Sequence, residues 1–323
     1  MRDPISVSLT LRQLRQLPEY KDAPKCLKKS QKKKEDLRIL LQNLRLLTDG
    51  GYRIDRHLGS GVFGDVFMVR GHSVWAAIKF FKSSPTNVER ELAMMHAFDQ
   101  VGIGVTMFRY DLFTGSVETS ASVIMEKLDD TLEKFLQVDR THQELESLVQ
   151  ALVGLTLSSY QANLMHGDLH VGNVGIEITN DRVTGKWVKQ VRLLDFTHAQ
   201  PIDQRVFKLE KYLTHEFGQF ISVLGCTHWF PRVTETNRRS LLQVLCLHIQ
   251  KIAPTLFRRL PPISNDVKKW NRVRRVWHQF PDYTGPLPPV PRSSVWLKPI
   301  DGGEGSTDDS TYYPDSTGAT ETE

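Results

Sequence analysis

The chain has few cysteines and no long apolar run. Its three cysteines, Cys26, Cys226 and Cys246, form no C-x-x-C pair, so the sequence suggests neither a disulfide framework nor a zinc site. No stretch approaches the roughly 20 apolar residues that span a bilayer, and the N-terminal residues lack the apolar run of a signal peptide. We therefore expect a cytoplasmic protein with no membrane partner.

The composition excludes bulk disorder, because 40% hydrophobic and 24% charged residues are ordinary for a folded protein. The length of 323 residues fits two packed lobes, together about 250 residues, with tails. The net charge is +5 although residues 301–323 contribute −7, so the rest of the chain carries +12. We interpret this excess as a solvated basic surface. Attraction of acidic substrates or of nucleic acid is the alternative, and nucleic acid is not required.

Residues 1–34 are expected to form a basic N-terminal tail. Its segment 21–34 is dominated by lysine, which is typical of a solvated tail, with a nuclear-import signal and hence a nuclear location as the alternative. Leucines then recur at helical spacing over residues 35–50, and two glycines follow as a stop. The sequence therefore predicts a helix over 35–50 that packs on the next domain.

Two regions of different pattern follow. Residues 51–128 contain short segments rich in Val, Phe and Ile, which indicate an antiparallel sheet, and one helical segment, NVERELAMMHAF. Residues 129–280 are mainly helical in pattern, with one hairpin. Residues 281–323 are Pro-rich and then acidic, and we expect them to be disordered. The predicted fold class is α+β, with a small antiparallel β-rich lobe and a larger helical lobe.

The last helical pattern, NDVKKWNRVRRVWHQF, has two different faces. Trp270, Val273 and Trp277 share one face, and lysines and arginines occupy the other. We interpret the tryptophans as core residues, with a partner surface as the alternative.

A glycine-rich segment, GSGVFGDV at 59–66, matches the pattern G-x-G-x-x-G-x-V. The matching residues are Gly59, Gly61, Gly64 and Val66. The pattern alone is weak, because dinucleotide-binding loops share part of it. Those loops lie between a strand and a helix, whereas strand-like segments stand on both sides here. We therefore predict a hairpin that covers phosphate groups.

A lysine and a glutamate follow in positions that suit a phosphate site. Lys79 stands in the apolar strand AAIK after Ala77, where an ammonium group is costly to bury unless it reaches an anion. Glu91 lies beside the apolar face of the helical segment and can pair with Lys79. Glu89 lies about 200° around the same helix and is expected to face solvent.

The strongest motif is HGDLHVGN at 166–173, followed after the hairpin by LLDF at 193–196. Phosphoryl transfer needs an acceptor for the proton of the attacking hydroxyl and metal ions that offset the phosphate charge. Asp168 can orient the hydroxyl, while Asn173 and Asp195 offer oxygen ligands for magnesium. A turn and a strand end would explain each motif singly, but not their order after a glycine loop and a lysine.

These motifs together resemble the protein-kinase-like superfamily, in order from about residue 51 to 196 and less closely to about 280. The resemblance implies a bilobal fold and the cofactors ATP and Mg²⁺. It implies that Lys79 holds the α- and β-phosphates, that Asp168 is the catalytic base, and that Asn173 and Asp195 bind magnesium. It also implies that Met125 is the gatekeeper and that the backbone of Glu126 and Leu128 recognises adenine.

The chain departs from the family at several positions. Gly167 replaces the arginine of H-R-D, so control by a phosphorylated activation loop is not expected. Thr197 replaces the glycine of D-F-G, and no A-P-E motif precedes the helical pattern near Leu209. His170 stands where serine/threonine kinases place a lysine and resembles the catalytic loop of aminoglycoside and choline-type kinases.

Three functions remain open from the sequence. The leading one is a compact serine/threonine protein kinase, supported by the complete glycine loop, AAIK and Glu91. A small-molecule hydroxyl kinase is the alternative, supported by HGDLHVGN and the missing A-P-E. A pseudokinase scaffold ranks last, because all five polar residues needed for the chemistry are present.

Overall fold

The protein is described by a computed structural model. The described residues are 9–22, 38, 41, 44–45, 47–49, 51–61, 64–71, 74–81, 85–114, 119–181, 185–277 and 285–289. Most of the lysine-rich segment and most of 281–323 lie outside them, so the expected disorder of the C-terminal segment stays a prediction. Within the described residues the fold mixes α-helices with antiparallel sheets, as the sequence predicted.

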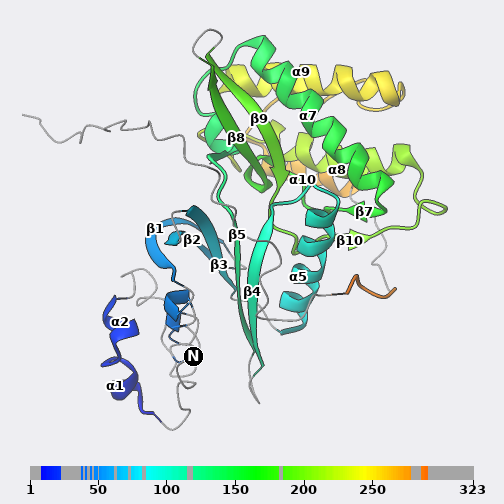
Figure 1. The fold of residues 1–323 in the computed structure, drawn as a ribbon. Helices are drawn as coiled ribbons and strands as arrows, with labels where there is room; N and C mark the ends of the chain where they lie inside the picture. The colour runs from blue at the N-terminus through cyan, green and yellow to red at the C-terminus, as the bar shows by residue number, and fades with distance from the viewer. Residues whose placement is uncertain are drawn as a thin grey trace, which may run out of the picture.

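A five-stranded antiparallel sheet occupies one end of the molecule (Figure 1). Its order is β1-β2-β3-β5-β4, and helix α5 (Pro85–Gln100) connects β3 to β4. Strand β4 was not predicted, because Arg109 and Asp111 interrupt its apolar pattern. As the edge strand it pairs on one side only, where charged side chains are tolerated. The strands are β1 Arg53–Ser60, β2 Gly64–Gly71, β3 Val74–Phe81, β4 Met107–Thr114 and β5 Thr119–Glu126.

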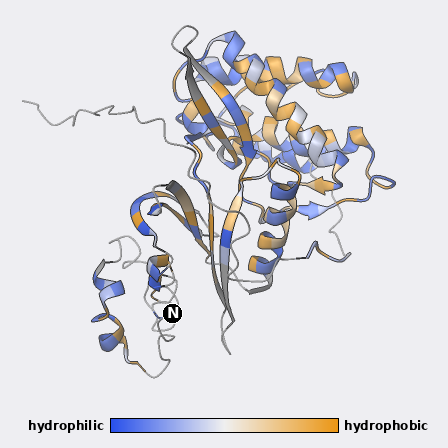
Figure 2. Cartoon of the chain, in the orientation of Figure 1, coloured by the Kyte–Doolittle hydropathy of each residue, from blue (hydrophilic) through white to orange (hydrophobic). Residues whose placement is uncertain are grey.

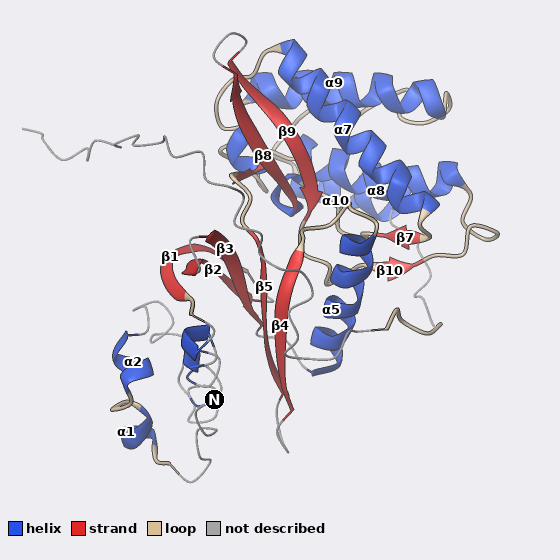
Figure 3. Cartoon of the chain, viewed as in Figure 1, coloured by secondary structure: helices blue, strands red, loops and turns tan. Residues whose placement is uncertain are grey.

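The second half of the chain is mainly helical, as Figure 3 shows in blue. A capping box at Thr141 and Glu144 begins its longest helix, α7. Two short sheets interrupt the helices: β6-β8-β9, which includes the predicted hairpin, and β7 with β10. The elements are β6 Asp130–Thr131, α6 Leu132–Phe135, α7 His142–Gln161, β7 Leu164–Met165, η1 Val171–Asn173, β8 Val174–Asp181, β9 Gly185–Leu193, β10 Gln200–Pro201, α8 Leu209–Gly225, α9 Glu235–Ile252 and α10 Val267–Trp277.

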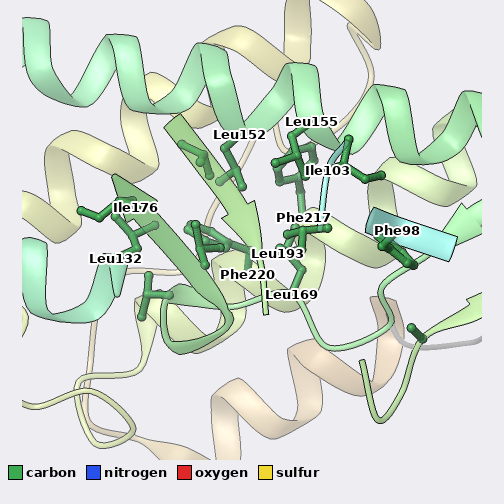
Figure 4. Packing of buried hydrophobic residues seen from close by; sticks show 14 of the residues in the cluster. Phe98, Ile103, Leu132, Leu152, Leu155, Leu169, Ile176, Leu193, Phe217 and Phe220 are labelled. Atoms are coloured by element: carbon green, nitrogen blue, oxygen red, sulfur yellow. The ribbon is translucent and has the colours of Figure 1, made fainter. Parts of the chain in front are cut away.

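One hydrophobic core joins the sheet to the helical half. It includes Met107 and Val123 from the sheet, Phe98 from α5, and Phe217 and Phe220 from α8. Figure 4 shows side chains from the helices and from the strand β9 converging at its centre. Figure 2 shows hydrophobic and hydrophilic residues mixed along the helices, as expected for helices with one buried face. The common core fixes the sheet and the helices relative to each other.

A second core covers the other face of the sheet. Alternate residues of β3 point to opposite faces, so Ala76, Ile78 and Phe80 belong to this core, while Ala77 belongs to the first core. Part of the segment expected as a tail contributes here as two short helices, α1 (Leu11–Leu14) and α2 (Pro18–Asp22), with Leu14 fully buried.

The predicted helix over 35–50 lies partly outside the described residues. Its described positions, among them Leu41, Leu44 and Leu47, are helical, and these leucines are buried in the second core. The alternation along β3 leaves Lys79 on the sheet face that looks toward the helical half.

Candidate active site

A cavity of about 380 Å³ lies between the sheet and the helical half. This volume lies within the range of small-molecule and cofactor sites, about 300–1,000 Å³. Every residue that the sequence assigned to the nucleotide or to the metal lines it: Gly59, Gly61, Gly64, Val66, Ala77, Lys79, Met125, Glu126, Leu128, Asn173 and Asp195. Glu91 and Asp168 are not lining residues, but Glu91 contacts Lys79 and Asp168 contacts Asn173.

The register of the sheet brings the glycine segment over the lysine. Val66 is paired with Lys79 across β2 and β3, and Ala77 is paired with Met125 across β3 and β5. The Gly61 N–H donates to the Gly64 carbonyl (2.8 Å), which closes the turn between β1 and β2. A Cβ at Gly64 would meet the Phe80 carbonyl oxygen at 2.7 Å, so only glycine fits this close approach.

Lys79 and Glu91 form a buried ion pair at the inner end of the cavity. The Lys79 Nζ also lies 3.5 Å from Asp195 Oδ1. Burial raises the pKa of Glu91 above its ordinary value, and the charge of Lys79 opposes this shift. Burial would also raise the pKa of Asp195, but Lys79 and the Thr197 hydroxyl outweigh it and lower that pKa. Glu89 is exposed, as predicted.

Thr197 bridges the two carboxylates, a contact that the sequence did not predict. Its Oγ1 lies 3.0 Å from Glu91 Oε2 and 2.7 Å from Asp195 Oδ1. A hydroxyl has one proton to donate, so it can donate to only one carboxylate at a time while both are ionised. The residue that replaces the glycine of D-F-G therefore ties α5 to the segment after β9.

Four donors surround Asp168, two from the segment that follows it in the chain and one each from α8 and α10. Asn173 Nδ2 lies 3.4 Å from Oδ2 and donates to the Asp168 carbonyl (3.0 Å), which leaves the amide oxygen of Asn173 for other ligands. His170 Nε2 lies 3.6 Å from Oδ2. Gln219 of α8 donates to Oδ1, and Arg274 of α10 approaches that oxygen to 3.8 Å.

This environment keeps Asp168 ionised. Burial would raise its pKa, but the surrounding imidazoles, His170 first, outweigh burial and lower the pKa to about 2. The Nδ1 of His170 accepts from the Gly172 N–H (3.0 Å), so Nε2 carries the ring proton that faces Asp168. A carboxylate with so low a pKa is a weak base, and it is better suited to orienting a hydroxyl than to removing its proton early.

The backbone around position 167 requires a glycine. Gly167 has φ +74°, and a Cβ there would meet the His198 carbonyl oxygen at 2.5 Å, so any other residue is strained. Its N–H donates to the Glu216 carboxylate of α8 (3.0 Å). Burial raises the pKa of Glu216 to about 7. On the other side, His166 Nε2 donates to the Leu194 carbonyl (2.8 Å), which ties the segment to the residue before Asp195.

The segment predicted to recognise adenine lies along the cavity between the sheet and β6. The Glu126 N–H already donates to the Thr106 carbonyl (2.9 Å), so this N–H is not available to a ligand. Residues 196–208, which precede α8, are partly tied down because β10 pairs with β7.

Comparison with protein-family models gives no match, and comparison with curated proteins gives none either. In the part of the chain that the structure describes, no three His, Cys, Asp or Glu side chains gather as a metal site. No helix of these residues is long and apolar enough to cross a membrane. The geometry of the cavity and the surroundings of Asp168 are therefore the features that bear on function.

Proposed function

We propose that the chain is an ATP-dependent phosphotransferase with a bilobal, protein-kinase-like fold, and that its acceptor is a serine or threonine hydroxyl of a protein. One observation supports this most. The glycine segment, Lys79 with its partner Glu91, and Asp195 all converge on a single cavity, and Asn173 connects that cavity to Asp168.

The charges inside the cavity fit a nucleotide triphosphate with magnesium. The Lys79 ammonium stands between two carboxylates on the cavity wall, where it can bind phosphate oxygens. The Asp195 carboxylate and the Asn173 amide oxygen would hold Mg²⁺, because magnesium prefers oxygen ligands and takes only one or two from the protein beside phosphates. Bound Mg-ATP would supply the transferable phosphoryl group and a cation that offsets its charge.

Asp168 would accept a hydrogen bond from the acceptor hydroxyl. As the hydroxyl oxygen bonds to the γ-phosphorus, the bond from that phosphorus to the ADP oxygen breaks, and the hydroxyl proton passes to Asp168. Because the pKa of Asp168 is only about 2, this proton moves late, and orientation of the hydroxyl is the larger contribution.

A small-molecule acceptor is the second candidate. His170 faces Asp168, and the segment 196–208 is short and partly held by β10. A long activation segment normally seats a peptide in the family that the motifs resemble, so a short one leaves room for a smaller acceptor.

The deciding experiment is transfer of labelled phosphate from ATP. The purified chain is incubated with Mg²⁺, generic protein substrates and a panel of small hydroxyl compounds, with Asp168→Asn as the matched inactive control. Label on protein serine or threonine supports the leading proposal, and label on a small hydroxyl compound alone supports the second. Failure to bind Mg-ATP would contradict both and favour a pseudokinase scaffold.

A further inference from the structure

Helix α10 delivers a cation to Asp168 from a distant part of the sequence. Trp270 is fully buried against α8, where a side chain at Gly225 would collide with its indole ring. The Asp266 side chain accepts from the Lys269 N–H (2.9 Å) and begins the helix. One turn beyond Trp270, on the same helix face, Arg274 points at the Asp168 carboxylate. The packing of Trp270 against α8 therefore fixes the position of the Arg274 guanidinium.

The ion pair that Arg274 makes is incomplete. Its NH2 lies 3.8 Å from Asp168 Oδ1, the guanidinium makes no hydrogen bond to any described residue, and 36% of the side chain is exposed. The same Oδ1 already accepts from Gln219. Arg274 thus keeps nearly all of its five donors for another anion, and they lie beside the group that would orient the acceptor hydroxyl.

The outer face of α10 extends this positive charge. The helix VKKWNRVRRVW has five lysines and arginines and no acidic residue. Lys268, Arg272 and Arg275 are exposed, and their spacing of four and three residues places them in one stripe, which we call the basic stripe. It spans about 10 Å along the helix axis, because each residue rises about 1.5 Å.

Some exposed cations of the molecule have carboxylate partners, although others, such as Lys251, have none among the described residues. Arg239 is paired with Glu235, Lys189 with Glu177, and Arg205 with Asp203. In the described part of the chain, no carboxylate pairs with a residue of the basic stripe. An ordinary solvated surface intersperses positive and negative charges, whereas α10 carries only positive charge and lies beside Asp168.

We propose that Arg274 and the basic stripe bind acidic side chains of the acceptor, so that the preferred substrate is a protein segment in which the accepting serine or threonine is flanked by Asp and Glu. This inference rests on the proposed kinase function and names its substrate class. An extended chain advances about 3.3 Å per residue. Arg274 would therefore reach a carboxylate one or two residues from the hydroxyl on Asp168, and the basic stripe, on the outer face of α10, would attract acidic residues further from the hydroxyl.

Acceptor binding would also change the contacts of Asp168. An acidic side chain of the acceptor would draw Arg274 away from Oδ1, which exchanges one ion pair for another and leaves Gln219 as the one donor that shares this oxygen with the hydroxyl. A neutral acceptor would have to compete with the guanidinium without offering it a replacement anion. Recognition of the acidic segment and exposure of Asp168 would thus be one event.

The test compares three peptides with one central serine and either Asp/Glu, Ala or Lys at the five positions on each side. Initial rates are measured with the full chain at saturating Mg-ATP. We expect kcat/KM for the acidic peptide to exceed that for the neutral one about tenfold or more, because one charge-assisted hydrogen bond is worth roughly that factor. The lysine peptide should be the poorest.

Variants assign the preference to α10. Arg274→Ala should reduce the ratio of acidic to neutral kcat/KM about tenfold, and Arg274→Lys should retain part of it. The triple variant Lys268→Ala, Arg272→Ala, Arg275→Ala should lower the ratio as well. The ratio is independent of how much enzyme is folded. Arg239→Ala removes an exposed arginine of α9 and should leave the ratio and the activity unchanged.

Two results would overturn the inference while the kinase proposal stands. The first is that the unaltered chain has equal kcat/KM for the acidic and the neutral peptide. The second is that Arg274→Ala leaves the ratio of acidic to neutral kcat/KM unchanged. Label on small hydroxyl compounds but on no peptide would also overturn it. If no acceptor of any kind is labelled, the proposed function itself fails, and the inference falls with it.

Discussion

The two sides of the candidate site are built in different ways. On the nucleotide side, sheet register brings the glycine segment, Lys79 and Met125 together on neighbouring strands, and α5 and the segment after β9 add the two carboxylates. The acceptor side is assembled around Asp168 from α8 and α10, and Gln219 lies 51 residues further along the chain. The first side combines Lys79 with carboxylates, whereas the second surrounds one carboxylate with donors. We infer that the motifs specify the chemistry and that the late helices specify the substrate.

The largest expected effects come from removing the charged groups themselves. Lys79→Met, Asp195→Asn and Asp168→Asn should each lower turnover, by roughly 10²- to 10⁴-fold, because positioning and charge stabilisation dominate phosphoryl transfer. Asp195→Asn should also weaken Mg-ATP binding, whereas Asp168→Asn should bind nucleotide nearly normally. Titration calorimetry with a non-hydrolysable ATP analogue measures nucleotide binding by each variant, and so distinguishes loss of binding from loss of chemistry. Equal, small losses in all three variants would contradict the active site proposed for this chain.

A second prediction concerns the Glu216 carboxylate beneath Gly167. Because its pKa is raised to about 7 in the folded protein, it contributes stability that is fully present below its unfolded pKa near 4.5 and is lost as pH rises through 7. Glu216→Gln removes this titration and keeps an oxygen for the Gly167 N–H. The free energy of unfolding of the variant, minus that of the unaltered chain, should therefore increase by on the order of 3 kcal/mol from pH 5 to pH 8. Denaturant unfolding of both proteins at pH 5 and pH 8 measures this difference. The same difference at both pH values would refute the raised pKa of Glu216.

The third prediction tests why glycine stands at position 167. Gly167→Ala should destabilise the protein by about 2 kcal/mol, because its φ of +74° strains other residues and the His198 carbonyl blocks a Cβ. Gly154→Ala is the matched control, since a Cβ there meets nothing within 4 Å and the residue lies inside α7. That control should be neutral or slightly stabilising. Thermal unfolding of both variants gives the comparison, and equal melting temperatures would show that the turn adapts.

The smallest expected effect is at Thr197. Thr197→Val keeps the shape of the side chain but removes the hydroxyl between Glu91 and Asp195, so kcat should fall about tenfold through lost alignment of those carboxylates. Thr197→Ser keeps the hydroxyl and should retain most of the activity. Initial rates at saturating ATP distinguish them. Equal rates for the valine and serine variants would show that the bridge has no role in turnover.

Local sequence patterns were sufficient to predict the strands and the helix that lie near the cavity. The segments predicted as strands before Lys79 and the helix containing Glu91 occur where the sequence placed them, because alternating apolar residues and glycine turns act over a few residues. The edge strand β4 was missed, because its charged residues obscure the alternation. The short helices α1 and α2 were missed as well, since their stability comes from packing of residues such as Leu14 on the sheet.

The sequence by itself determined which residues would carry the proposed phosphoryl transfer and in what order they occur, because each motif is local and its side-chain chemistry is independent of the fold. Only the tertiary structure decided what surrounds Asp168. The burial of Trp270 against Gly225 sets the rotation of α10 and so the position of Arg274, and the packing of α8 sets Gln219 and Glu216. Such contacts join residues far apart in the chain, and no periodicity or motif within a short window encodes them.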